Sequence, residues 1–252
     1  MQLSFIQPQS STSSGMSLRH ARSQKHLRSL VVPIPALIVS WGVSAICYWQ
    51  ASATLGLFLG PLILATLYVP PLILSENGCV ARLSVLVAVI IGPTLVWLSV
   101  GNKQVINPHQ LLQCMLVMAG WVSAVSGGTL ILRELRVVPI LASTVTIIAS
   151  LFWLTWPIWL SPILASHRHA VGWLSWDHPI MAMNSVVQHL GLWGSPMGGS
   201  DLAYRYLTIL NQDVAYSHSQ SIWPFVLVHE CIGVPLMSAA FLLARIRVKP
   251  RG

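Results

Sequence analysis

Long apolar runs separated by short polar segments dominate the sequence. Six runs reach about 18 residues or more, the length at which a transmembrane helix is expected, and they cover residues 29–49, 54–74, 83–100, 111–132, 137–163 and 222–244. A helix of about 20 residues matches the ~30 Å hydrocarbon core of a bilayer. The pattern therefore predicts an all-α fold: a polytopic membrane helix bundle with six transmembrane helices.

The basic residues fall unevenly between the two sides of such a bundle. If the six runs alternate in direction, only Lys103, Arg168 and Arg205 lie on one side. The other eleven share the side of both chain ends: Arg19, Arg22, Lys25, Arg28, Arg82, Arg133, Arg136, Arg245, Arg247, Lys249 and Arg251. Because Lys and Arg accumulate in cytoplasmic loops, we predict that both termini are cytoplasmic and that the protein lies in a bacterial inner (plasma) membrane.

Composition agrees with a membrane protein. Charged residues make up 8% of the chain, hydrophobic residues 54%, and the mean hydropathy is +0.69, whereas soluble domains carry about 25% charged residues. The net charge of +8 comes from basic residues at the ends of apolar runs, as anionic headgroups favour. The expected partner is therefore the lipid bilayer and not a nucleic acid.

The chain divides into two parts. Residues 1–28 are polar, Ser-rich and basic, and they are typical of either a cytoplasmic tail or a helix lying on the membrane surface. Residues 29–252 form the predicted transmembrane domain. Residues 51–53 (Ala-Ser-Ala) are similar to a signal-peptidase site, but the preceding apolar run exceeds the ~7–15 residues of a signal peptide. We therefore expect residues 29–49 to remain as an anchor.

The connection between the last two runs, residues 164–221, is long enough to have structure of its own. Pro179 follows Asp177 and His178 and is suited to the first turn of a helix, and apolar residues then recur at helical spacing. A second short helix is expected over residues 200–210. We predict two amphipathic helices at the outer membrane surface.

His229 and Glu230 lie seven to eight residues into the last run, some ~10–12 Å below the outer boundary. An ionisable residue at that depth should face the bundle interior or a wet cavity and is a candidate functional site. The alternative is a structural link to the outer helices. Candidate partners for Glu230 are His229, Arg205 or a histidine of the outer segment.

The His- and Trp-rich segment 164–230 supports a second interpretation, an outward-facing metal- or haem-handling protein. The sequence requires no cofactor, but imidazole and carboxylate groups bind transition metals, and the weak candidate ligands are Asp177, His178, His189, His229 and Glu230. The run Trp173-Leu174-Ser175-Trp176-Asp177 also resembles the Trp-rich outer loop of haem-handling proteins of cytochrome c maturation.

The whole-chain architecture resembles the permease subunits of type-2 ABC exporters: a basic N-terminal stretch, six spans and short outer helices before the last span. The turn Ser75–Arg82 is shorter than their cytoplasmic coupling helix. The resemblance implies a permease-like or accessory subunit of a membrane transport or assembly complex, with other membrane subunits and an ATPase as candidate partners. The chain has no Gly-x-x-x-x-Gly-Lys loop, so we expect it to be non-catalytic by itself; an enzyme acting on lipids through His and Asp is a third alternative.

Overall fold

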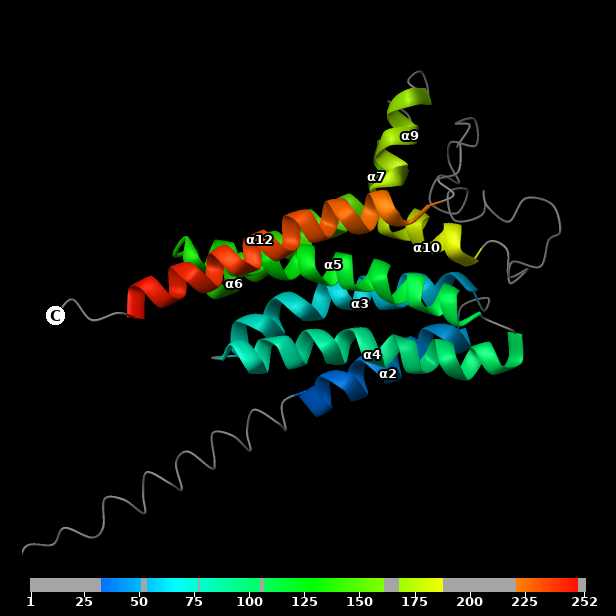
Figure 1. Cartoon of the computed structure of the whole chain (residues 1–252), viewed down its shortest axis with the longest axis horizontal. Helices are drawn as coiled ribbons and strands as arrows, with labels where there is room; N and C mark the ends of the chain where they lie inside the picture. Colours follow the sequence, from blue (N-terminus) through cyan, green and yellow to red (C-terminus); the bar gives the residue numbers. More distant parts are fainter. Residues whose placement is uncertain are drawn as a thin grey trace, which may run out of the picture.

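The computed structural model describes residues 33–50, 54–76, 78–104, 107–160, 168–187 and 221–248. These residues are helical throughout, apart from short turns, and contain no strand. The helices are α2 (Pro33–Gln50), α3 (Thr54–Ser75), α4 (Cys79–Gln104), α5 (Pro108–Glu134), α6 (Pro139–Leu154), α7 (Trp156–Trp159), α9 (Arg168–Trp176), α10 (Pro179–Val187) and α12 (Trp223–Val248) (Figure 1). The all-α prediction is confirmed for the described residues.

Three described helices are long and apolar enough to cross a membrane. They cover Cys79–Ser99, Pro108–Glu134 and Trp223–Arg247, and each overlaps one of the six predicted runs. The other three runs contain shorter apolar helices, Ile34–Ile46, Leu59–Ser75 and Pro139–Leu154. The chain therefore has the helices of a membrane protein, and the number of six spans stays a prediction. The basic segment 1–28, residues 51–53 and the expected helix over 200–210 lie outside the described residues.

The run 137–163 does not form one helix, which corrects the predicted boundary. Helix α6 ends at Leu154, and Thr155 leaves helical geometry with φ −105° and ψ 3° before the short helix α7. Pro157 is the physical reason. It lacks an N–H for the helix ladder, and in a continuous helix its ring would clash with the carbonyl four residues earlier, that of Trp153. The chain direction changes here, between α6 and α9 (Figure 1).

The long helices lie side by side along a common direction, and α9 stands away from them (Figure 1). At one end Arg247 of α12 pairs with Glu134 of α5, with Nη1 and Oε2 3.2 Å apart. At the opposite end the amide of Gln110 in α5 lies 3.5 Å from the Val186 carbonyl of α10. Helix α10 begins at Pro179, as expected, and it lies at the end of the bundle away from the C-terminus.

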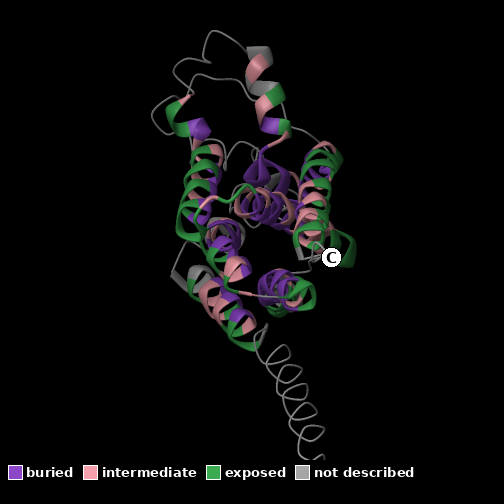
Figure 2. Cartoon of the chain, turned by 90° about the vertical axis from the view of Figure 1, so that its left-hand side faces the viewer, coloured by how far each residue is buried: buried purple, intermediate pink, exposed green. Residues whose placement is uncertain are grey.

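Buried faces turn toward the interior of the bundle and exposed faces turn outward (Figure 2). Trp97, Met118 and Phe225 are almost fully buried, and the Trp121 indole donates a hydrogen bond of 3.0 Å to Thr66 across α5 and α3. The outward faces are also apolar, as with Ile140, Ile148 and Phe152 along α6. Since soluble monomers rarely expose such continuous apolar surface, lipid is the fitting solvent for it.

Several hydroxyl groups within the bundle bond to their own helices. The side chains of five buried Ser and Thr residues each donate to the carbonyl four residues earlier, at 2.6–2.9 Å: Ser44, Thr66, Ser126, Thr129 and Thr146. This local bond satisfies a polar group where no water is present. These hydroxyls are therefore compatible with the membrane interior.

Helices α5 and α12 approach each other at two glycines. A Cβ atom added to Gly233 would lie 2.5 Å from the Ser123 carbonyl carbon, and one added to Gly127 would lie 2.8 Å from the Gly233 oxygen. Neither contact leaves room for a methyl group. Among the described helices, α12 packs extensively on α5 alone. This glycine contact consequently fixes the position of α12.

Substitution of Gly233 by alanine should destabilise the protein strongly. The new methyl group would meet backbone atoms of Ser123 and Ala124, and overpacking of this kind costs about 1–3 kcal/mol. Gly42→Ala in α2 is the matched control, because nothing lies within 4 Å of its added Cβ. We expect Gly233→Ala to lower the melting temperature in detergent and Gly42→Ala to leave it unchanged or raised. Equal melting temperatures for the two variants would contradict this helix contact.

Candidate intramembrane polar site

His229 lies on the face of α12 that packs against α5. Its Cβ lies near Gly120, and its ring stacks on Phe225 with the ring centroids 4.0 Å apart. Trp121 of α5 lies at a centroid distance of 5.7 Å. The side chain is buried. His229 therefore packs closely over Gly120, where an added Cβ would lie 3.4 Å from the His229 Cβ.

Asp177, between α9 and α10, meets this histidine. Nδ1 of His229 lies 3.2 Å from Oδ1 of Asp177 and 3.1 Å from the Phe225 carbonyl oxygen. Oδ1 of Asp177 is buried and accepts no hydrogen bond of good geometry from the described residues. One N–H is thus placed between two acceptors. The contact ties α12 to the segment between α9 and α10.

His178 is fully buried beside this pair and outside the three candidate spans. Its Nε2 donates to the Leu154 carbonyl at 3.1 Å, and the Trp156 ring lies edge-on to it with centroids 5.7 Å apart. Nδ1 finds no partner among the described residues. Burial lowers the pKa of His178 to about 4; hydrogen bonds to the Leu154 and Trp153 carbonyls oppose this shift, and the nearby His229 adds to it. The neutral imidazole therefore predominates at pH 7.

Glu230 points to a different neighbour from the ones expected. The Ser123 hydroxyl of α5 donates to Oε1 of Glu230 at 3.4 Å, a long hydrogen bond. Glu230 is half-buried and lies seven residues after Trp223, the first residue of α12, which is ~10 Å along the helix. Of the predicted partners, Arg205, His167, His189 and His218 lie outside the described residues, so pairing of Glu230 with them stays a prediction. The sequence did not identify Ser123 as a partner of Glu230, because Ser123 lies in a run of small residues that is typical of close helix packing.

The weak metal candidates are not gathered into one centre. Asp177 and His229 meet, while His178 and Glu230 bond elsewhere, and His189 lies outside the described residues. No group of three potential ligands occurs in the described part of the chain. The tryptophans near this end differ in environment: Trp156 is buried against His178, whereas Trp173 is exposed.

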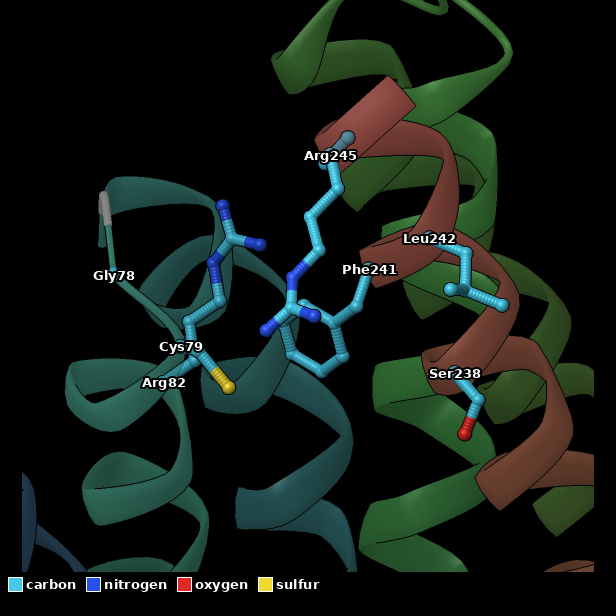
Figure 3. Close-up of a pocket in the computed structure, with 8 residues that line it drawn as sticks. Gly78, Cys79, Arg82, Ser238, Phe241, Leu242 and Arg245 are labelled. Atoms are coloured by element: carbon cyan, nitrogen blue, oxygen red, sulfur yellow. The ribbon is translucent and has the colours of Figure 1, made fainter. Parts of the chain in front are cut away.

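A groove lies between α4 and α12, with α5 at its base; we call it the α4–α12 groove. It consists of an outer hollow of ≈ 680 Å³ and an inner hollow of ≈ 290 Å³, which share Cys79, Arg82, Ser238 and Phe241 in their linings. Arg245 lines the outer hollow (Figure 3), and Ser123 lines the inner one. The groove thus runs from an arginine-lined mouth to the hydroxyl that bonds Glu230. Sequence reasoning used Arg82 and Arg245 only as signals of topology.

No protein-family model, curated protein or solved structure matches this chain.

The bond between Ser123 and Glu230 should appear as coupling in thermal stability. In a double-mutant cycle, Glu230→Ala and Ser123→Ala are expected to be non-additive by about 0.5–1.5 kcal/mol, since each removes the same hydrogen bond. Glu230→Gln should behave nearly as wild type, because the amide oxygen still accepts. Glu230→Ala with His178→Gln is the comparison cycle. Coupling that is larger with His178 than with Ser123 would contradict the assigned partner.

The buried His178 should make stability depend on pH. Its folded pKa of about 4 lies below the ordinary value near 6.5, so the unfolded chain binds more protons between these values and stability falls as the pH drops from about 6.5 toward 4. His178→Gln retains a donor for the Leu154 carbonyl but does not titrate. We expect the melting temperature of this variant to fall less steeply over that interval than wild type. His109→Gln, at an exposed position of α5, should retain the wild-type slope; identical slopes for all three proteins would refute the effect.

Proposed function

We propose that this chain is a permease-like or accessory subunit of a membrane transport or assembly complex and is non-catalytic by itself. In this proposal it crosses a bacterial inner membrane six times, with both termini in the cytoplasm. The eleven basic residues on one side support the orientation. Helices α2, α3 and α6 supply the spans beyond the three that are long enough by themselves.

The α4–α12 groove carries the proposal. It enters the bundle at the end that bears Arg82 and Arg245 and reaches Ser123 beside Glu230. A polar group that borders a cavity at membrane depth is typical of substrate and ion pathways. The groove exists because α12 packs extensively on α5 and not on α4. A moderate shift of α12 would therefore open or close it.

In this proposal, a partner or an ion gradient supplies the energy source that the chain lacks. The sequence has no nucleotide-binding loop, so energy would come from an ATPase subunit or an ion gradient. The exposed face of α12 carries large apolar side chains, among them Leu227, Ile232 and Leu242. Such a face suits either lipid or the apolar face of another membrane subunit. A carboxylate at Glu230 would then serve a proton- or substrate-coupled step.

Purification of the full chain from its native membranes tests the proposal. We expect an ATPase that contains a nucleotide-binding loop to co-purify in a fixed ratio, and nucleotide hydrolysis by the complex to depend on this chain. Glu230→Gln should leave assembly and yield intact and abolish coupled activity. Glu76→Gln, which alters an acid outside the candidate spans, is the matched control and should leave that activity unchanged.

Two further measurements on the same preparation address the alternative. Stoichiometric transition metal or a Soret absorption band, without an ATPase, would contradict the proposal and favour a metal- or haem-handling protein.

A further inference from the structure

The mouth of the α4–α12 groove concentrates positive charge. Five arginines lie around this end of the bundle, with two glutamates: Arg82, Arg133, Arg136, Arg245, Arg247, Glu76 and Glu134. Glu134 is engaged by Arg247 at 3.2 Å, and Glu76 meets Arg82 through its backbone carbonyl at 3.0 Å. Nη1 of Arg133 is buried and finds no acceptor among the described residues. The local charge therefore favours an anion.

Two of these arginines face the groove itself. Arg82 comes from α4 and Arg245 from α12, and both side chains lie at the space between the two helices (Figure 3). Guanidinium groups bind phosphate through paired hydrogen bonds. In the described structure, no acidic side chain at this end is paired with the guanidinium group of Arg82 or Arg245. Their remaining N–H donors are therefore available to a phosphate. The mouth is thus suited to an anionic phosphate group.

The interior of the groove has a different chemistry. Its lining is mainly apolar and includes Leu83, Leu86, Val87, Ile90, Val234 and Met237. On α4 the lining runs from Cys79 to Ile90, eleven residues or ~16 Å along a helix. This length is about half of the ~30 Å hydrocarbon core. The groove therefore extends through about one leaflet, which is the depth of one acyl chain.

We propose that the α4–α12 groove binds an anionic phospholipid of the leaflet on the Arg82 side. The phosphate lies between Arg82 and Arg245, and an acyl chain lies along the apolar lining toward Ser123. A free phosphate ion would leave the apolar lining empty, and a zwitterionic lipid would add a cation to a mouth that is already basic. The inference rests on the proposed function only in that both use this groove, because lipid binding requires neither transport nor a partner.

Native mass spectrometry of the full-length protein measures this binding directly. The protein is titrated with phosphatidylglycerol or with phosphatidylcholine of the same acyl chains. A basic residue near an anionic lipid surface contributes about 1 kcal/mol, or roughly 5-fold in affinity. We expect phosphatidylglycerol to bind more tightly than phosphatidylcholine. Arg82→Gln and Arg245→Gln should each weaken its binding roughly 5-fold, and the double variant about 30-fold.

Controls separate charge, shape and ligand source. Arg136→Gln alters an exposed arginine that does not line the groove, and it should bind phosphatidylglycerol as wild type does. Ser238→Trp fills the groove but retains both arginines, and it should lose lipid binding. Inorganic phosphate at millimolar concentration should not displace the lipid. Displacement by phosphate would identify an anion site in place of a lipid site and would overturn the proposal.

Equal binding of the two lipids, or full binding by the double arginine variant, would also overturn it. These outcomes are independent of the function proposed above. Lipid selectivity in a protein that carries stoichiometric metal or haem and no ATPase would contradict that function alone. An active complex without lipid selectivity would contradict this inference alone.

Discussion

The close backbone contact between α5 and α12 determines where the polar side chains of these two helices lie. In lipid, helices gain little from burying apolar side chains against one another, so close packing at small residues becomes the main attraction. Gly127 and Gly233 permit that approach, and Gly120 packs against His229 about one turn from the contact between Ser123 and Gly233. Because α12 packs extensively on no other described helix, this contact sets where Glu230 meets Ser123 and how wide the α4–α12 groove is.

The bilayer explains which polar groups bond locally and which bond between helices. Hydroxyls such as Ser126 and Thr129 satisfy themselves within their own helix and leave the helix faces free to pack. His229 and Glu230 cannot do so completely, and they reach Asp177 of the outer segment and Ser123 of α5. His229 therefore joins α12 to the residue between α9 and α10, and Glu230 joins α12 to α5. Because Ser123 also lines the α4–α12 groove, these two contacts connect Asp177 to the groove through α12.

Sequence periodicity and charge predicted more of the fold than of the site. Apolar run length located every long described helix, and Pro179 marked the start of α10, because both signals are local. The early end of α6 depended on Pro157 and Thr155 and was missed, since a proline within an apolar run can also be accommodated in a membrane helix. The Ser123–Glu230 bond and the meeting of Arg82 with Arg245 at one groove join residues far apart in sequence. No local pattern encodes such pairs.

The proposed sidedness is the central claim, because it would place the mouth of the α4–α12 groove on the cytoplasmic face. Single-cysteine variants test it in intact cells with a membrane-impermeant thiol reagent. One variant keeps Cys79, which is exposed at the groove mouth, and the other carries Lys103→Cys near the opposite end of α4. We expect Lys103→Cys to be labelled from outside and Cys79 to be labelled only after the membrane is permeabilised. The reverse pattern would contradict the orientation and the cytoplasmic groove together.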